Sequence, residues 1–325
     1  MRRRDFMTLL GGTAAAWPLA ARAQQAMPVV GFLHSGSPEA TAFVVAPFRQ
    51  GLSEAGYVEG RDVKIEYRWA YDNNDRLPEL AADLVRRRVA VIATPNGTPA
   101  ALAAKAATMT TPIVFQIAGD PVQIGLVDSL NRPGGNVTGV TSMNVEIGAK
   151  RLGLLHELLP AAKRFAVLVN PNNPGSDMSK VVQMAASGIG RQIETLTATT
   201  NREIDTAFAT LLQKGAEALL TSPDAFFIIR RVQIVTLAAR HAVPAMYHVR
   251  DFTDVGGLMS YTTSLAELFR QTGTYTGRIL KGEKPAVMPV MQPTKFEFVI
   301  NLQTARTLGI EVPPSLLALA DEVIE

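Results

Sequence analysis

The sequence has 325 residues, of which 47% are hydrophobic and 19% are charged, with 20 prolines, 25 glycines and no cysteine. This composition fits a folded protein and excludes a disordered, collagen-like or disulfide-stabilised chain. The lack of cysteine also excludes thiolate metal sites and a cysteine nucleophile. At roughly 150 residues per domain, the length predicts two domains.

The net charge of +3 is concentrated at the N-terminus. Residues 1–23 hold four arginines and one aspartate, so the rest of the chain keeps 28 of the 32 lysines and arginines and 28 of the 29 acidic residues. A balanced chain has no excess of positive charge for binding phosphates or anionic lipids. We therefore expect no nucleic-acid partner.

Residues 1–23 have the layout of an export signal, with a basic start, an apolar stretch at 7–21 and a small-x-small site at Ala21-Arg22-Ala23. The apolar stretch is too short for a membrane span and is interrupted by Pro18. Arg3-Arg4-Asp5-Phe6-Met7 resembles the twin-arginine export motif. We predict cleavage after Ala23 and a mature protein that is free in a bacterial periplasm; a retained anchor is the alternative.

From Met27 onward, short β-branched runs alternate with amphipathic stretches, a pattern typical of parallel sheets with helices on both faces. In the first half, strands are expected at residues 29–33, 63–67, 89–93 and 112–117. Between them, apolar residues recur at helical spacing over 44–55 and again over 77–85, as they do on the buried face of a helix.

The same alternation returns in the second half. Strands are expected at residues 165–169, 193–196, 218–221 and 245–247, with helices over 204–212 and 228–239. Turn-forming residues at 131–136, a Gly-Gly pair at 256–257 and the segment from Pro285 mark three crossings between the halves. We predict a first lobe from residues 24–138 with 262–284 and a second lobe from 139–261 with 285–325. Several crossings without a flexible linker predict a hinge that closes on a ligand.

In open parallel sheets, ligands bind beyond the carboxyl ends of the strands. The loops at these positions supply the candidate ligand contacts Ser35, Asn96, Thr98, Asp120, Asn170, Asp224 and Tyr247. Thr98 precedes a helix that begins at Pro99, and a helix N-terminus favours a carboxylate. Asp120 and Asp224 are candidates for pairing with a ligand ammonium, and Tyr247 is a candidate for stacking on a flat ligand. The structural alternatives are a plain helix cap for Thr98, turn or helix caps for the two aspartates and strand packing for the tyrosine.

No catalytic or metal-binding motif can be assembled. The four histidines lack a spacing such as H-E-x-x-H, and the chain has no P-loop, no dinucleotide fingerprint and no G-x-S-x-G elbow. Ser35 and His34 are adjacent, so on a strand their side chains point to opposite faces and form no catalytic pair. We therefore predict that the protein is not an enzyme and needs neither a cofactor nor a metal.

Several motifs together resemble a known family. They are Gly56-Tyr57-Val58-Glu59-Gly60-Arg61, Gly119-Asp120-Pro121-Val122, Gly134-Gly135-Asn136-Val137-Thr138-Gly139, Asn170-Pro171-Asn172-Asn173-Pro174 and Lys295-Phe296-Glu297-Phe298-Val299-Ile300-Asn301-Leu302. In combination, and over essentially the whole chain after the signal, they resemble the substrate-binding proteins of ABC transporters related to the tryptophan/tyrosine-binding group.

This resemblance implies an α/β protein of the type I periplasmic-binding-protein fold, with two doubly wound Rossmann-like lobes joined by a three-segment hinge. It implies capture of a small solute between the lobes and delivery to ABC permease subunits in the inner membrane, driven by a separate ATPase. Aromatic amino acids are the best-known ligands of the group, so we expect an aromatic or carboxylate-bearing solute and a monomeric receptor. The alternatives are an exported enzyme on a doubly wound fold and a ligand-sensing receptor for a membrane signalling partner.

Overall fold

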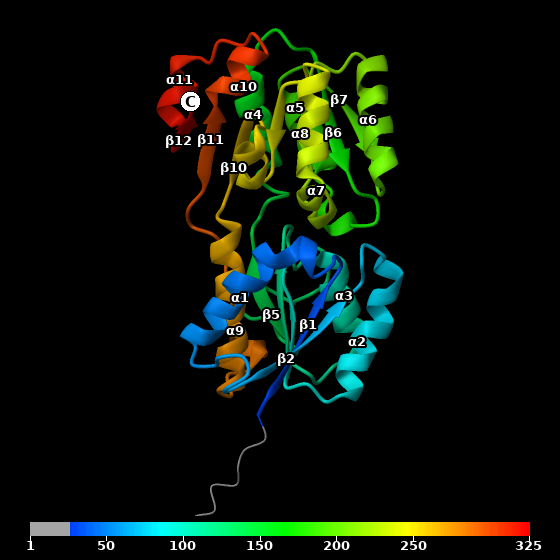
Figure 1. Ribbon diagram of the computed structural model, residues 1–325, viewed down its shortest axis with the longest axis vertical. Coiled ribbons are helices and arrows are strands. Elements are labelled where there is room, and N and C mark those ends of the chain that lie inside the picture. The colour runs from blue at the N-terminus through cyan, green and yellow to red at the C-terminus, as the bar shows by residue number, and fades with distance from the viewer. Residues whose placement is uncertain (1–26) are drawn as a thin grey trace, which may run out of the picture.

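The computed structural model describes residues 27–325, apart from the side chain of Pro174, so the predicted export signal lies outside the described residues. Figure 1 shows two lobes stacked along the long axis, each built on a sheet with helices on both sides. Within residues 27–325, no helix combines the length and the apolar character that a membrane crossing needs.

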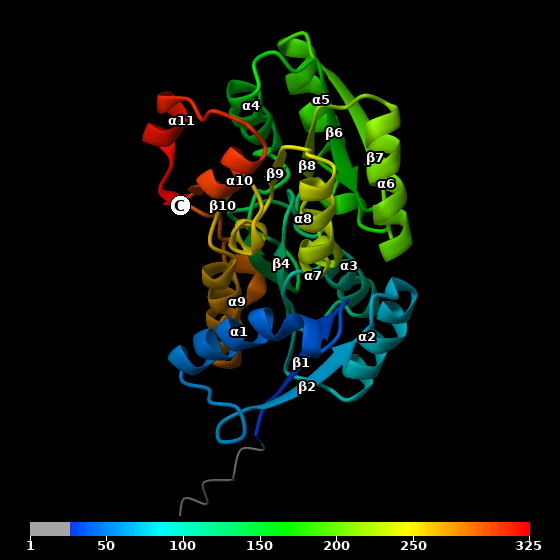
Figure 2. The ribbon, with the colours of Figure 1, turned by 45° about the horizontal axis from the view of Figure 1, so that its top comes forward.

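The first lobe contains a five-stranded parallel sheet in the order β2-β1-β3-β4-β5. Its strands are β1 (Val29–His34), β2 (Lys64–Trp69), β3 (Val91–Thr94), β4 (Ile113–Ile117) and β5 (Val137–Thr141). Its helices are α1 (Ala42–Glu54), α2 (Leu77–Arg86), α3 (Thr98–Ala107) and α9 (Leu265–Leu280). Helices α1 and α9 pack on one face of the sheet, and α2 and α3 pack on the other (Figure 2).

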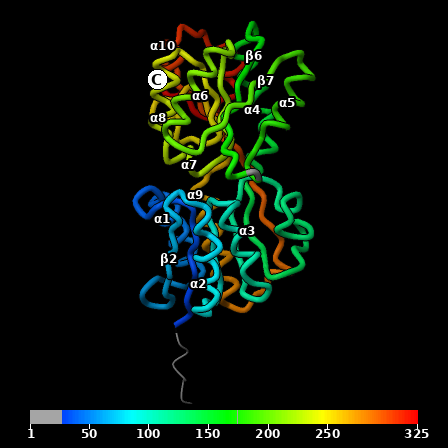
Figure 3. The backbone as a smooth tube through the Cα atoms, turned by 90° about the vertical axis from the view of Figure 1, so that its right-hand side faces the viewer, coloured from blue at the N-terminus to red at the C-terminus, as the bar shows by residue number. Residues whose placement is uncertain are grey.

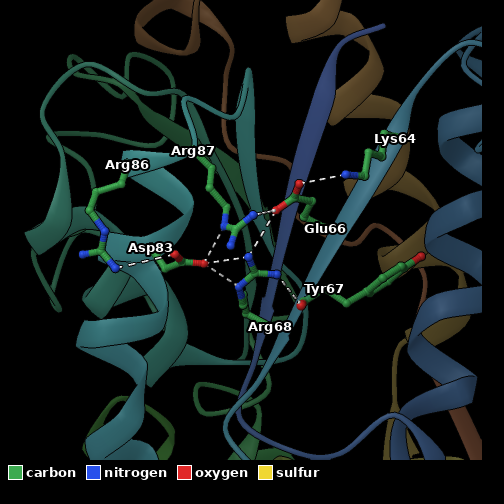
Figure 4. Close-up of polar contacts among 7 residues, drawn as sticks. All are labelled: Lys64, Glu66, Tyr67, Arg68, Asp83, Arg86 and Arg87. Atoms are coloured by element: carbon green, nitrogen blue, oxygen red, sulfur yellow. Dashed lines mark hydrogen bonds and ion pairs between the residues drawn. The ribbon is translucent and has the colours of Figure 1, made fainter.

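Strand β2 lies at the edge of this sheet, and its two faces differ in chemistry. Ile65 is buried beside α1, whereas Glu66 and Arg68 point toward α2. Arg68 Nη2 lies 2.6 Å from Asp83 Oδ2 on α2, and Arg87 Nε lies 2.9 Å from the same oxygen (Figure 4). Charges of this kind stop an exposed edge strand from pairing with another chain.

The second lobe contains a seven-stranded sheet in the order β12-β11-β10-β9-β8-β6-β7. Its strands are β6 (Arg164–Val169), β7 (Gln192–Thr197), β8 (Ala218–Thr221), β9 (Ala245–Tyr247), β10 (Met259–Thr262), β11 (Glu297–Asn301) and β12 (Glu322–Ile324). Only the β10–β11 pair among them is antiparallel.

Helices cover both faces of the second sheet. Two buried clusters separate α4 (Gly148–Leu158), α5 (Ser179–Gly188), α10 (Leu302–Thr307) and α11 (Pro314–Leu319) from α6 (Asn201–Gln213), α7 (Ala225–Ile229) and α8 (Arg231–Arg240). The helix predicted over 204–212 corresponds to α6, in which Ile204, Phe208 and Leu211 are buried but Leu212 is exposed. The helix predicted over 228–239 is divided into α7 and α8, and Val232 in α8 is exposed.

The chain crosses between the lobes three times, near residues 142–147, 263–264 and 292–296. The first crossing follows β5 instead of preceding it, because β5 pairs with β4 as the edge strand of the first sheet. Residues 285–291, which we expected in the second lobe, lie against the first: Thr141 N donates to Met291 O at 2.9 Å, and Val140 bridges to Met291. Figure 3 shows this returning segment beside β5. Burial of Met288 and Val290 in the clusters of the first lobe accounts for the difference.

Candidate functional site

The loops after the strand ends of both sheets meet between the lobes and enclose two adjoining cavities. One contains about 340 Å³ of empty space and the other about 460 Å³, both partly open to solvent. They share five lining residues, which are Asn96, Gly97, Asn173, Asp224 and Ala225.

The wall formed by the first lobe is rich in hydrogen-bond donors. Asn96 has a left-handed backbone (φ 59°) and its N–H donates to Gln116 Oε1 at 2.9 Å, which turns the chain so that α3 begins at the cleft. Gly97 is the N-cap of α3, and no side chain caps the helix, so the N–H groups of Thr98 and Ala100 are free for a ligand; Pro99 has no N–H, and the N–H of Ala101 donates to Gly97 O. The structural alternative for Thr98, a plain helix cap, does not apply, because Thr98 is the first helical residue and its hydroxyl has no partner among the described residues.

Three side-chain groups on this wall are buried and have no hydrogen-bond partner among residues 27–325: Ser35 Oγ, Asn96 Nδ2 and Thr98 Oγ1. Leaving a buried polar group unpaired costs about 1–3 kcal/mol. Because all three residues line the cavities, a polar ligand is the natural partner for these groups.

The wall formed by the second lobe is rich in acceptors, and its centre is Asp224. Asp224 Oδ2 accepts from Asn173 Nδ2 at 2.7 Å, and Oδ1 accepts from Asn170 Nδ2 at 3.1 Å and from Phe226 N at 2.9 Å. Burial raises the pKa of Asp224, and these donors counteract that rise. Asn173 Oδ1, on the same wall, is buried without a partner among the described residues.

His248 adds a neutral acceptor to the same wall. Its Nδ1 lies 2.9 Å from Thr221 Oγ1, and its Nε2 lies 3.5 Å from Asp224 N. Burial lowers the pKa of His248 well below its ordinary value, so the imidazole is uncharged at neutral pH. With Nδ1–H donating to the threonine, Nε2 accepts the backbone N–H of Asp224, so the imidazole helps to hold Asp224 in place.

The two lobes touch around these cavities. Asn74 Nδ2 of the first lobe donates to Asn172 O of the second at 3.4 Å, and Arg230 Nη2 lies 3.5 Å from Asp72 Oδ2. A β-carbon on Gly119 would lie 2.5 Å from Gly175 O, and a β-carbon on Gly175 would lie 2.5 Å from the methyl group of Thr98. The structure is therefore a closed arrangement of the lobes.

Five of the seven expected contacts line these cavities, namely Ser35, Asn96, Thr98, Asn170 and Asp224. Asp120 lines neither of them. Its Oδ1 accepts from Val122 N at 2.8 Å, so this carboxylate closes a turn, as its structural alternative suggested.

Tyr247 does not face the ligand either, and the stacking role expected for it is wrong. Its side chain is 1% exposed and stacks on Phe252 at 4.6 Å inside the core of the second lobe. Successive residues of a strand point to opposite faces, so it is the next residue, His248, that reaches the cavity. Phe226 supplies an aromatic wall that the sequence reasoning missed.

Comparisons with known proteins agree with this architecture. Residues 35–324 match the family described as ABC transporter substrate binding protein. The tyrosine-binding protein of Clostridioides difficile is 27% identical over 266 residues, which cover 81% of this chain and 76% of that protein.

Solved structures are similar over nearly the whole chain. A domain from Streptococcus pneumonia in complex with L-Trp is 27% identical, with a TM-score of 0.83 over 91% of this chain and 99% of that one. A conserved domain protein from Vibrio cholerae is 25% identical, with the same TM-score and coverage. A ligand-free, open substrate-binding protein from Clostridium difficile, 24% identical, has a TM-score of 0.63 over 91% of this chain and 99% of that one.

The family binds small solutes outside the cytoplasm and passes them to membrane permeases, and its members are receptors rather than enzymes. The two-lobed α/β architecture is that of type I periplasmic binding proteins. This chain belongs to the substrate-binding proteins of ABC transporters.

Proposed function

We propose that the protein binds an aromatic α-amino acid between its lobes and delivers it to an ABC permease in the inner membrane of the cell. The observation that carries the proposal is that the two walls of the cleft differ in their hydrogen-bonding groups. The unpaired donors Asn96 Nδ2 and Thr98 Oγ1 lie on the first-lobe wall, and Asp224 and the unpaired acceptor Asn173 Oδ1 lie on the second-lobe wall. An α-amino acid has one carboxylate and one ammonium on neighbouring atoms, and this pair matches the two walls.

The carboxylate is assigned to the N-terminus of α3. The free N–H groups of the first helical turn, the hydroxyl of Thr98 and the amide of Asn96 are all donors without partners among the described residues. A helix N-terminus also carries a partial positive charge, which favours an anion.

The ammonium is assigned to Asp224, with the unpaired Asn173 Oδ1 as a neutral acceptor beside it. The described residues that line the two cavities include Asp72 and Asp224 but no lysine or arginine. Asp72 is paired with Arg230, so the charge of Asp224 is the one left for the ligand. A plain aromatic acid would bring a second negative charge into this cleft and gains nothing from Asp224.

The side chain of the ligand is assigned to the apolar part of the cleft. Ile117, Ile228 and Leu265 line the first cavity, and the ring of Phe226 lines the second. A stacked aromatic pair adds about 0.5–1.5 kcal/mol to the burial of apolar area. The similarity to a tyrosine-binding protein and to a domain solved with L-Trp supports an aromatic ligand.

Micromolar binding corresponds to about −8 kcal/mol, which one anion site, one ion pair and a few neutral hydrogen bonds can supply. No bond in the ligand has to break. The proposal includes export to the periplasm by the twin-arginine route, a monomeric mature protein and ligand contacts from Ser35, Asn96, Thr98, Asn170 and Asp224.

Native mass spectrometry of the mature protein, followed by a thermal-shift screen, tests the proposal. The screen covers the twenty amino acids, aromatic acids without an amine, and sugars. We expect tyrosine, tryptophan or phenylalanine to give the largest rise in melting temperature. A sugar or a plain aromatic acid as the best ligand would refute the amino acid assignment, and turnover of a bound compound would refute a receptor without catalysis.

A further inference from the structure

An arginine is buried directly behind the cleft. Arg151 on α4 is fully buried, and its guanidinium donates to oxygens from three separate segments. Nε donates to Tyr261 O at 2.8 Å, and Nη1 donates to Asn144 O at 2.6 Å. Nη2 donates to Asn144 Oδ1 at 2.5 Å and to His248 O at 3.3 Å. Taking a cation out of water costs several kcal/mol, so the position calls for an explanation.

The three segments are the ones that connect the hinge to the cleft. Asn144 lies in the first crossing between the lobes, and Tyr261 lies in β10, just before the second crossing. His248 follows β9, and both it and Asn144 line the first cavity. Arg151 therefore fixes two residues of the cavity wall against the hinge.

The contact also fixes the orientation of the Asn144 amide. A guanidinium has only donors, so the group that faces it must be the amide oxygen. Thr262 Oγ1 lies 3.5 Å from the same Oδ1 and adds a second, weaker donor. The Nδ2 group of Asn144 donates to no residue that the structure describes, and the residue borders the cavity. A flipped amide would set its N–H groups against those of Arg151.

We propose that Arg151 is a positioning residue that makes Asn144 present a hydrogen-bond donor, and not an acceptor, to the carboxylate of the ligand. Asn144 lines the same cavity as Thr98 and Gln116 at the start of α3, where the carboxylate is assigned. The inference rests on the proposed function, because it needs a ligand that carries a carboxylate at this place.

The variant Asn144→Asp tests the inference without removing the partner of Arg151. The aspartate still offers an oxygen to the guanidinium, so the fold and the hinge contact are kept, but the second oxygen replaces the N–H donors toward the cavity. We expect binding of L-tryptophan to weaken at least 30-fold by calorimetry. Tryptamine, which lacks the carboxylate, should change less than 3-fold. L-tyrosine and tyramine form a second pair of probes.

Two control variants separate this effect from charge and from stability. Asn131→Asp adds the same charge at an exposed position that lines neither cavity, and it should change the ratio of the two affinities less than 3-fold. Arg151→Met should weaken the binding of L-tryptophan about 10-fold. Arg191 is a partly buried arginine that donates to Pro160 O, and Arg191→Met should leave the affinity for L-tryptophan unchanged. Melting temperatures and circular dichroism show that each variant is folded at the temperature of titration.

The outcomes distinguish this inference from the proposed function. Wild-type protein that binds no aromatic amino acid refutes the proposed function. Wild-type protein that binds L-tryptophan, with an unchanged ratio of tryptophan to tryptamine affinity in Asn144→Asp, refutes only the role of Arg151 and Asn144.

Discussion

The contact between Gly119 and Gly175 predicts that one methyl group blocks closure of the lobes. Gly119 follows β4 in the first lobe, and Gly175 lies in the second lobe near residues 170–173. A β-carbon on Gly119 would lie 2.5 Å from Gly175 O, a backbone atom that cannot rotate away. The Gly119 carbonyl is itself held by Thr141 Oγ1 at 2.8 Å. The backbone of Gly119 is not in the left-handed region, so alanine is compatible with the open state.

The size of the effect follows from the distances. At 2.5 Å the added carbon lies about 0.9 Å inside the 3.4 Å at which ordinary contact begins, so the lobes must stay apart by about that amount. The bond from Asn74 to Asn172, already 3.4 Å long, is then lost, and the pair Asp72–Arg230 lengthens from 3.5 Å. A hydrogen bond contributes about 0.5–1.5 kcal/mol and an exposed ion pair about 0.2–1 kcal/mol. With weaker contacts to the ligand, we expect a loss of about 1.5–3 kcal/mol, or about 10- to 100-fold in affinity.

Calorimetry with L-tryptophan measures this loss, and small-angle X-ray scattering measures whether the ligand still compacts the protein. Gly153→Ala is the matched control, because a β-carbon there meets no atom within 4 Å. Gly119→Ala should melt within about 2 °C of wild type without ligand, because its effect is confined to the closed state. Wild-type affinity and wild-type compaction in Gly119→Ala would refute closure through this contact.

Three further predictions concern charged or titratable groups. Asp224→Asn should weaken the binding of L-tryptophan about tenfold or more, as measured by calorimetry. The affinity of the wild-type protein should also fall as the pH falls through the raised pKa of Asp224, because the protonated carboxyl no longer attracts an ammonium. Equal affinity in both proteins would exclude this pairing. A double-mutant cycle of Asp72→Asn and Arg230→Gln should give a coupling energy of about 0.5 kcal/mol in ligand affinity, because both side chains are partly exposed. Additive effects of the two substitutions would show that this ion pair does not contribute to closing the cleft. Burial lowers the pKa of His34 to about 4. Between pH 6.5 and 4 this histidine is therefore protonated in the unfolded chain but neutral in the folded protein, so the free energy of unfolding decreases as the pH falls through this range. Urea unfolding should show that His34→Asn loses roughly 3 kcal/mol less than wild type between pH 7 and pH 4, and equal losses would contradict a neutral buried imidazole.

Most strands and helices are readable from the sequence because each lobe repeats one simple pattern. Buried parallel strands appear as short β-branched runs, and residues 29–33 and 165–169 match β1 and β6 within one residue. The crossings are harder to predict. Residues 137–141 and 285–291 could join either sheet by their sequence. The pairing of β5 with β4 assigns the first segment to the first lobe, and the bridge from Val140 to Met291 places the second segment beside it.

The loops that form the site can be predicted from the rule that ligands bind beyond the carboxyl ends of parallel strands. This rule does not predict which side chains of these loops face the ligand. Tyr247 and His248 differ by one position, and the phase of β9 decides which of them reaches the cavity. The role of Arg151 could not be predicted, because two of its partners, Tyr261 and His248, lie 110 and 97 residues away and accept through backbone oxygens; only Asn144 is near it in sequence.

The central claim is that the cleft selects a molecule with both a carboxylate and an ammonium. Its most direct test is calorimetric titration of the mature protein with L-tryptophan, tryptamine and indole-3-propionate, and with the corresponding tyrosine series. We predict a micromolar dissociation constant for at least one of the two amino acids. Both analogues of that amino acid, the one without the carboxylate and the one without the amine, should bind at least tenfold more weakly. An aromatic acid without an amine that binds as tightly as the amino acid would contradict the account.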